Sequence, residues 1–367
     1  MVFEKEALWM WLNCVTGPQV TVFEQITSKY PDIQDVYALA RARDAAAFQP
    51  WGAPLVKRLF DSANERFIED RLAWLRRNEV TCVPLFGDEY PVLLKEIRHP
   101  PAMLYVKGTL PRDPVLPIAM VGMRKYTAYG ESVARHFGEE LASCGATVVS
   151  GMARGIDQFA AEGAMRVQSA QCPTIAVLGS GIDVVYPEEN LALYHAIIER
   201  GAVVSEFLPG TRPLRENFPI RNRVISGLAR GVVVVEAAER SGTSITVNHA
   251  QDQDRDIFAV PGRITDMNSV GPNRLIQKGE AKPVFCAADI LCEYGVRSKA
   301  TVSQKEIDTT LLSPLEKRIV EALLSGEKNA DELCELLEID ASEINCGLTS
   351  LQFSGIIKQL PGRVFGI

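Results

Sequence analysis

The stretch TVVSGMARGIDQFAAEGA, residues 147–164, decides the fold. Its apolar run stops at Ser150 and Gly151, and a helical pattern starts after Gly155. An apolar run of this length is typical of a buried strand, and the glycines let the backbone turn tightly into the next helix. The free N–H groups of such a turn and the positive end of the helix dipole favour an anion above the strand. A plain tight turn needs the same glycines, so this stretch alone leaves both interpretations open.

The same pattern recurs from residue 117 to about residue 295. The expected strands are residues 118–121, 147–150, 174–178, 202–205, 232–235, 257–260 and a short one near Val284, and the expected helices start near Tyr126, Ile156, Leu191, Arg221, Ser244 and Asn273. Nearly continuous apolar strands joined by helices predict an α/β fold with a doubly wound, mostly parallel sheet covered on both faces. In such a sheet the ligand binds at the carboxyl ends of the strands.

Three domains are expected in the 367 residues. Residues 1–113 read as mainly helical, a SAM or helix-hairpin-helix type of domain with a connecting segment, and 114–296 hold the sheet. A helix-hairpin-helix module contacts nucleic-acid backbone, whereas a small aromatic core explains the same pattern without any ligand. After a polar linker, residues 312–367 predict a winged-helix domain.

The expected recognition helix of this last domain, ASEINCGLTSLQF, contains no Lys or Arg. Residues 301–367 hold six basic against eleven acidic side chains. Binding of duplex DNA by this helix would proceed without neutralising phosphates. The pattern therefore favours protein contact or packing for the C-terminal domain.

Composition narrows the function classes. The formal net charge is −7, from 39 Lys and Arg against 46 Asp and Glu, so nucleic-acid binding requires a local basic patch. No apolar run approaches the roughly 18 residues of a membrane span, and Glu4 and Glu6 oppose a signal peptide, which predicts a cytoplasmic protein without membrane contact. The eight cysteines and four histidines form no pairs of the metal-ligand kind, so reduced thiols and no metal site are expected.

Arginines mark the expected ligand edge of the sheet. The segment contains neither a dinucleotide-binding glycine fingerprint nor a P-loop. Between residues 207 and 235 it carries five arginines against one acid, a local charge of +4: Arg212, Arg215, Arg221, Arg223 and Arg230 against Glu216. Residues two apart on a helix point about 200° apart, so at most one of Arg221 and Arg223 faces a shared ligand, and the other is free for a salt bridge or a dimer interface. Guanidinium groups suit phosphate, and Phe218 offers a face on which a base stacks.

Several linked motifs resemble the DprA/Smf family. They are GDEYPVLLKEIRHPPAMLYVKG (87–108), VGMRKYTAYG (121–130), VVSGMARGID (148–157), VLGSGIDVVYPEEN (177–190), SEFLPGTRPLRENFPIRNRVISGLARGVVVVEA (205–237), SGTSIT (241–246) and FAVPG (258–262). The resemblance implies an extended Rossmann-like domain that binds single-stranded DNA without sequence preference, dimerises, and helps to load the RecA recombinase during natural transformation. It implies neither catalysis nor a cofactor.

Carried over by position, the resemblance implies a strand-binding pocket. Its expected residues are Gly122, Arg124, Ser150, Gly151, Arg154, Gly155, Phe218, Arg221, Asn222 and Arg223. Three positions depart from the family pattern: Met123 replaces a usual serine hydroxyl, Asp254 replaces a usual glycine, and Glu280 interrupts a usual Gly-Ala pair.

A nucleotide-processing enzyme of the phosphoribohydrolase, lysine-decarboxylase-like type is the alternative. Those enzymes share this kind of sheet, with a Gly-Thr turn and an acid after a strand. Glu236 with Ser241, Gly242 and Thr243 is a partial match, although the Pro-Gly-Gly-x-Gly-Thr-x-x-Glu motif is absent.

Overall fold

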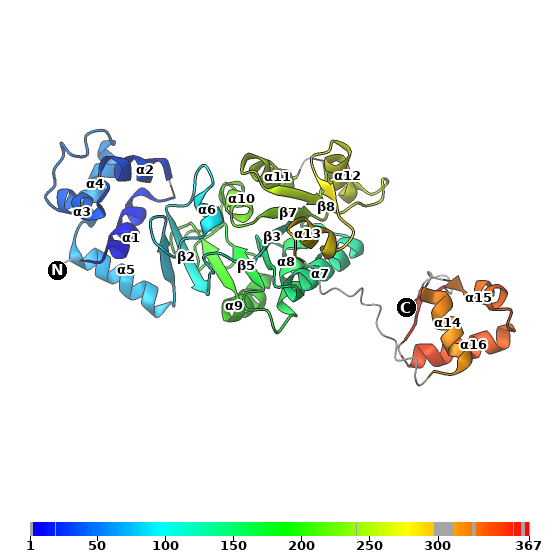
Figure 1. Ribbon diagram of the computed structural model, residues 1–367. Helices are drawn as coiled ribbons and strands as arrows, with labels where there is room; N and C mark the ends of the chain where they lie inside the picture. The colour runs from blue at the N-terminus through cyan, green and yellow to red at the C-terminus, as the bar shows by residue number, and fades with distance from the viewer. Residues whose placement is uncertain are drawn as a thin grey trace. The chain divides into compact units, whose positions relative to one another are not determined.

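The structure is a computed structural model that describes residues 3–18, 20–239, 241–296, 312–324, 328–354, 356–360 and 364–366. The chain divides into two compact units, Met1–Lys299 and Ala300–Ile367. The larger unit is built on one nine-stranded sheet, with a cluster of helices beside β2 and further helices over the sheet (Figure 1).

The strand order of this sheet is β1-β2-β6-β5-β4-β3-β7-β8-β9. The strands are β1 Thr81–Pro84, β2 Met103–Gly108, β3 Pro117–Val121, β4 Thr147–Ser150, β5 Thr174–Val177, β6 Ala202–Ser205, β7 Gly231–Val234, β8 Asp256–Ala259 and β9 Lys282–Pro283. Strands β3 to β9 pair in parallel, which confirms the predicted doubly wound sheet. The chain runs outward from β3 in one direction through β4, β5 and β6, and in the other through β7, β8 and β9. The winding therefore reverses between β3 and β7, and ligands bind at such a point in open α/β sheets.

Two further strands were not expected from the sequence. β1 and β2 form an antiparallel pair, and β2 continues the sheet by pairing antiparallel with β6. The segment 1–113 contains mostly helices, but it also holds these two strands, which the prediction of a helical domain left out. β1 has only four residues, it ends at Pro84, and its first residue is exposed, so its sequence carries little of the alternation that signals a strand. The segment placed in the expected N-terminal domain thus contributes two strands to the central sheet.

Helices cover the sheet on both faces. They are α6 Val92–Lys95, α7 Ala128–Ser143, α8 Ile156–Met165, α9 Leu191–Arg200, α10 Asn217–Gly227, α11 Gly242–Asp252, α12 Val270–Gln277 and α13 Ala287–Glu293, with short 3-10 turns at Glu188–Asn190 and Met267–Ser269. In β3, Ile118 and Met120 join the core under α7, α8 and α13, while Ala119 and Val121 join the core under α10 and α11. The period-2 alternation of a strand thus fills two cores at once.

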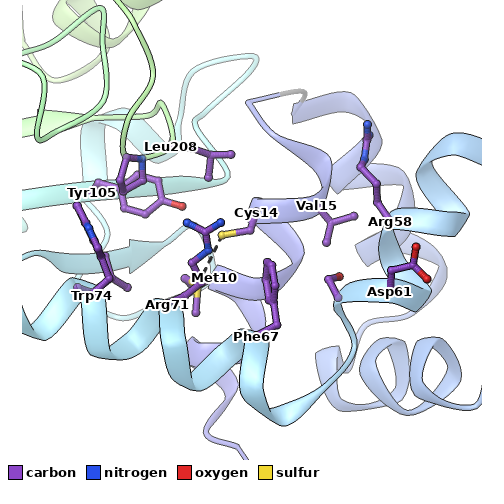
Figure 2. A pocket seen from close by; sticks show the side chains of 13 residues that line it. Met10, Cys14, Val15, Arg58, Asp61, Phe67, Arg71, Trp74, Tyr105 and Leu208 are labelled. Carbon is purple, nitrogen blue, oxygen red and sulfur yellow. Dashed lines mark hydrogen bonds between the residues drawn. The ribbon is translucent and has the colours of Figure 1, made fainter.

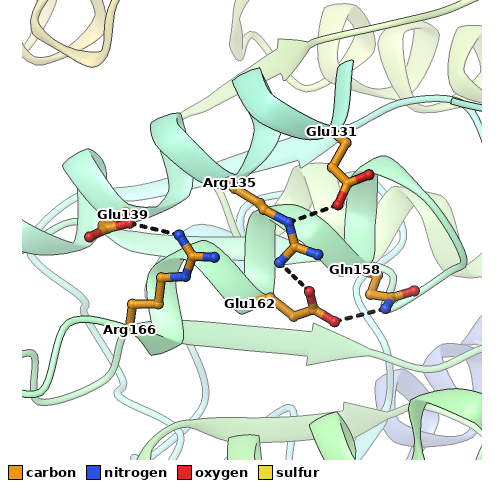
Figure 3. Close-up of polar contacts among 6 residues, drawn as sticks. All are labelled: Glu131, Arg135, Glu139, Gln158, Glu162 and Arg166. Carbon is orange, nitrogen blue, oxygen red and sulfur yellow. Dashed lines mark hydrogen bonds and ion pairs between the residues drawn. The ribbon is translucent and has the colours of Figure 1, made fainter. Parts of the chain in front are cut away.

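Ion pairs and hydrogen bonds fix α7 against α8 (Figure 3). The Arg135 guanidinium on α7 bonds to Glu131 one turn earlier, at 3.1 Å, and to Glu162 on α8. The Gln158 amide donates to Glu162 at 2.7 Å. Because these two helices begin directly after the loops that follow β3 and β4, their packing fixes the positions of the two loops relative to each other.

The N-terminal helices form an aromatic core that is continuous with the sheet. They are α1 Lys5–Thr16, α2 Val20–Lys29, α3 Ile33–Arg41, α4 Ala53–Ser62 and α5 Glu65–Arg77. Trp11 is fully buried and its indole N–H donates to Ser62 Oγ at 2.9 Å. The Tyr105 hydroxyl on β2 donates to Asn13 of α1 at 2.8 Å. The aromatic residues of this region therefore build a core, as the simpler reading of the sequence predicted.

The C-terminal unit has its own small core around Ile319, Leu333 and Leu348. It contains α14 Pro314–Leu324, β10 Lys328–Asn329, α15 Ala330–Leu337, α16 Ala341–Phe353, β11 Lys358–Leu360 and β12 Val364–Gly366. Its strands form an antiparallel sheet of order β10-β12-β11. The helices and strands follow the order expected of a winged helix, and that assignment stays a prediction. Over the described residues of both units, every helix is too short or too polar to cross a membrane.

Candidate nucleic-acid interface

A pocket of about 780 Å³ opens at the carboxyl ends of β3 and β7, where the winding of the sheet reverses. We call it the strand-end pocket. Its walls come from three segments and three further residues. The segments supply residues 121–125 at the end of β3, residues 213, 215, 218, 219, 221, 222 and 225 around the start of α10, and residues 241–243, 245 and 246 at the start of α11; the further residues are Ala153, Asp157 and Tyr186. A smaller recess of about 40 Å³ adjoins it, and Arg124, Phe218 and Arg221 line both. The ligand edge expected from the sequence is therefore hollowed.

Two glycines let the loops after β3 and β4 interlock. A side chain at Gly122 would lie 2.7 Å from the Ile156 side chain. Gly155 has a positive φ of 84°, and a Cβ there would lie 2.4 Å from the Met123 carbonyl oxygen. That carbonyl accepts a hydrogen bond from the Ile156 N–H at 3.3 Å. Met123 thus holds the loop through its backbone, a contact that does not depend on the serine usual in the family.

A buried carboxylate and a buried guanidinium lie beneath the pocket. Asp157 accepts from the Gly151 N–H at 3.0 Å. Burial raises the pKa of Asp157, while the Arg221 charge and bonds from the Gly151 and Gly122 N–H groups oppose that rise. Arg221 is 4% exposed and donates to the carbonyl oxygens of Gly151, at 2.8 Å, and Val177. Burial lowers the pKa of Arg221 to about 10, so it stays charged at neutral pH.

These contacts give Arg221 two roles. Nη1 of its guanidinium ties the ends of β4 and β5 together. Its Nε is buried without a hydrogen-bond partner among the described residues, although the side chain lines the pocket. Arg221 therefore adds positive potential from below the pocket floor while it supports the loops.

Phe218 and Arg124 form the accessible part of the pocket. The Arg124 guanidinium lies 5.5 Å from the Phe218 ring centroid, and that of Arg221 lies 5.8 Å from it. The Tyr186 ring packs against the Phe218 ring, and the two ring centroids are 5.6 Å apart. Phe218 is half-buried and Arg124 is exposed. Arg124 forms no ion pair with any residue that the structure describes, so its charge is available to a ligand.

The five arginines of residues 207–235 do not form one cluster. Arg215 and Arg221 line the pocket, and Arg212 is exposed on the loop before α10. Arg223 binds the buried Glu206 carboxylate at 2.5 Å and does not line the pocket. Arg230 lies at the amino ends of the strands, because its N–H donates to the carbonyl oxygen of Pro117, the first residue of β3. The sequence predicts that at most one of Arg221 and Arg223 faces a shared ligand, and the pocket lining includes Arg221 but not Arg223, which was among the expected pocket residues.

The other expected residues lie at different depths. Ser150 is fully buried, and its hydroxyl accepts from the Met152 N–H at 3.3 Å. Arg154 lines the smaller recess but forms a 2.5 Å ion pair with Glu189, and that hydrogen bond raises the pKa of Arg154. Asn222 lines the main pocket and donates to the Gly242 carbonyl oxygen at 3.4 Å. Ser150 thus shapes the loop from within, while Arg154 and Asn222 border the ligand space.

Three contributors were missing from the list of expected pocket residues: Lys125, the 241–243 turn, and Arg215, which was named only as part of the basic run. Lys125 and Arg215 are exposed, line the pocket and pair with no acid in the described chain. They bring the lining to four basic side chains, Arg124, Lys125, Arg215 and Arg221, against the single carboxylate of Asp157. Lys125 and Arg215 lie inside the motifs that carry the family resemblance. Their positive charge was therefore the feature of the sequence that could have identified them as pocket residues.

Glu236, the candidate acid of the enzyme alternative, is buried and makes hydrogen bonds that stabilise the fold. It is 2% exposed and accepts hydrogen bonds from the Thr127 N–H, at 3.1 Å, and from the Thr127 hydroxyl. The Asn268 amide donates to it at 3.4 Å. Thr127 caps the start of α7, so Glu236 anchors the loop after β3. It does not belong to the lining of the strand-end pocket.

Comparisons with known proteins agree with this architecture. The family model described as DNA recombination-mediator protein A matches residues 81–295. The DNA processing protein DprA of Bacillus subtilis is 39% identical over 228 residues, which cover 62% of this chain and 75% of that protein.

Two solved structures extend the agreement to the fold. The X-ray structure of DprA from Streptococcus pneumoniae is 30% identical, with a TM-score of 0.67, and the match covers 80% of this chain and 99% of that one. DNA processing protein A from Helicobacter pylori, whose structure is described as giving insights into a unique single-stranded-DNA binding mode, is 26% identical, with a TM-score of 0.52, over 59% of this chain and 95% of that one. With the family model matching more than half of its length, this chain belongs to the DNA recombination-mediator protein A family, the DprA/Smf proteins that its motifs resemble.

Proposed function

We propose that the chain binds single-stranded DNA in the strand-end pocket. The observation that carries the proposal is the Phe218 ring, which is accessible at a pocket wall with the Arg124 charge 5.5 Å from its centroid. Stacking on an aromatic face suits every base, and guanidinium groups suit the phosphates between bases. The excess of basic side chains in the lining supplies the local patch that an acidic protein needs. The binding described for the H. pylori protein supports the same assignment.

Strand preference tests this proposal. The full-length chain is expected to bind oligo-dT more tightly than a duplex of the same length, because a duplex keeps its bases stacked on each other and away from Phe218. Binding should weaken strongly as salt rises, since phosphate contacts release counterions. The measurement is a titration of both labelled DNAs across a salt series. Equal or tighter duplex binding at moderate salt would contradict the proposal.

The wider role follows from family membership. We propose that single-strand binding serves DNA recombination and natural transformation by protecting incoming DNA and helping RecA to load. Stimulation of RecA-dependent strand exchange on a single strand would measure this activity. A chain that binds oligo-dT without any effect on RecA would separate the two proposals.

We also propose a homodimer formed through the Rossmann-like unit. Large apolar side chains are exposed on the loops after β8 and β9, with Ile264 92%, Met267 74% and Phe285 76% exposed. Large apolar side chains this exposed are candidates for a protein contact, and we propose that they take part in the dimer interface. Analytical ultracentrifugation is expected to give twice the chain mass, and a monomer at micromolar concentration would contradict the dimer.

A further inference from the structure

A second cavity, of about 390 Å³, lies between the N-terminal helices and the central sheet. We call it the N-terminal cavity. Its lining is mostly apolar and includes three aromatic rings, Phe67, Trp74 and Tyr105. In Figure 2 the side chains of Phe67, Arg71 and Trp74 extend from α5 toward Cys14 and Tyr105, and Leu208 lies on the side opposite α5. The cavity has the volume of a small-molecule site, and it is separate from the strand-end pocket.

Two arginines place positive charge on this apolar lining. The Arg71 guanidinium lies 5.4 Å from the Phe67 ring centroid. Arg71 lines the cavity together with Cys14, and its charge opposes the rise in the Cys14 pKa that burial causes. Neither Arg58 nor Arg71 forms an ion pair within the described residues, and the one lining carboxylate, Asp61, pairs with Arg43 at 3.4 Å. Aromatic walls with free guanidinium groups favour a ligand that carries both flat rings and negative charge.

The cavity lies at the same sheet edge as the strand-end pocket. Tyr105 of β2 pairs with Ser205, the last residue of β6, and thus stands at the carboxyl end of a parallel strand. The loop that leaves β6 contributes Leu208 and Pro209 to the cavity and then Pro213 and Arg215 to the strand-end pocket. Arg212, between these pairs, is exposed and forms no ion pair with a described residue. One loop, with a free arginine midway, therefore borders both hollows.

The separation matches a short length of single strand. β2 and β3 are four places apart in the sheet order, and neighbouring strands lie about 4.8 Å apart, which gives roughly 19 Å across the sheet. Stacked nucleotides rise about 3.4 Å each, so roughly six nucleotides span this distance and fewer do so when extended.

We propose that the N-terminal cavity is a second nucleotide site for the same DNA strand that occupies the strand-end pocket. A base stacks between the half-buried rings of Phe67 and Trp74, with the buried Tyr105 as part of the wall, and Arg71 binds the adjacent phosphate. This inference rests on the proposed single-strand binding and adds a path along residues 208–215. It assigns the N-terminal helices a role in DNA binding that their packing alone does not require.

Oligonucleotide length tests the proposal in the full-length chain. Arg71→Ala is expected to weaken binding of dT20 by about 5- to 50-fold and to change binding of dT2 less than twofold, because dT2, even when extended, is too short to reach from the strand-end pocket to the cavity. Arg76→Ala removes an exposed arginine of the same helix outside the cavity and should leave both affinities unchanged. Arg124→Ala, by contrast, should weaken both oligonucleotides.

Fluorescence gives an independent readout of stacking. dT20 should quench the tryptophan emission of the chain, dT2 should not, and Trp74→Phe should abolish the quenching while the other three tryptophans remain. If dT20 and dT2 bind wild type and Arg71→Ala alike, the second site is overturned and the proposed function stands. If the wild-type chain binds no oligonucleotide of either length, both proposals fall. Quenching by free dTMP with no dependence on strand length would instead show an isolated nucleotide site and overturn the shared strand.

Discussion

Arg124→Ala and Phe218→Ala together are expected to weaken binding of oligo-dT by roughly 2–6 kcal/mol, about 1–3 kcal/mol from each side chain. Arg124 is exposed beside the ring and without an acid partner among the described residues, so its loss removes a phosphate contact. Phe218 supplies the stacking face. The affinity of each single variant and of the double variant, measured on one oligonucleotide, gives the three values.

Salt dependence separates the two contributions. The slope of log affinity against log salt should fall by about 0.7 in Arg124→Ala, because one phosphate contact on a single strand releases about that many counterions. Phe218→Ala should lower the affinity at every salt concentration without changing the slope. Because the guanidinium lies 5.5 Å from the ring centroid, the two losses are expected to couple, and the double variant measures that coupling.

Arg230→Ala is the matched control. It removes an exposed arginine from the same stretch of sequence, but at the opposite, amino edge of the sheet. Its affinity for oligo-dT should equal that of the wild type within about 0.5 kcal/mol. Normal binding by the Arg124 and Phe218 double variant, or an equal loss in Arg230→Ala, would show that DNA does not occupy the strand-end pocket.

The parallel strands β3 to β7 were predictable because each is buried on both faces. Residues 147–150 and 202–205 are continuous apolar runs that end in serine, and the structure gives strands with those bounds. Such an apolar run predicts a buried strand from its own sequence, whichever strands lie beside it in the sheet. β1 lacked that signal because its four residues range from exposed to buried and it pairs with a strand about twenty residues later. α10 begins at Asn217, four residues before the expected start, since Pro219 is tolerated anywhere in a first turn.

The motifs that form the site were predictable from the sequence. The burial of each side chain, and the edge of the sheet at which it lies, were not. α10 has eleven residues and is therefore about 16 Å long, enough to carry the chain from the carboxyl edge of the sheet back toward the amino edge. Arginines near its start and just beyond its end thus belong to different edges, although the sequence shows one basic run. The partners of Arg221 and Arg223 are distant in sequence, at Gly151, Val177 and Glu206, and only the fold brings them together.

Arg221→Met is expected to lower the free energy of unfolding by about 3–5 kcal/mol at neutral pH, in addition to any effect on DNA. The substitution keeps apolar volume but removes the charge that opposes the burial of Asp157, and it takes the donor from the carbonyl oxygens of Gly151 and Val177. Removing one partner of a buried charge pair leaves the other charge uncompensated. Chemical denaturation of the variant and the wild type measures the difference. Arg223→Ala cannot serve as the control, because it breaks another buried ion pair, with Glu206. Glu188→Ala, at an exposed position, is the control and should leave the free energy of unfolding unchanged.

The pH dependence of the Arg221→Met deficit identifies its cause. Burial already raises the pKa of Asp157, and the loss of the Arg221 charge raises it further. A carboxyl whose pKa is higher in the folded than in the unfolded state adds stability below its unfolded pKa of about 4, and that stability is lost as pH rises through the folded value. The deficit of Arg221→Met should therefore be full at neutral pH and shrink on acidification toward pH 4. Adding Asp157→Asn to Arg221→Met should restore much of the loss at neutral pH, because a neutral pair needs no compensation. A deficit that is constant with pH and is not relieved by Asp157→Asn would show that Arg221 stabilises the loops through its carbonyl bonds alone.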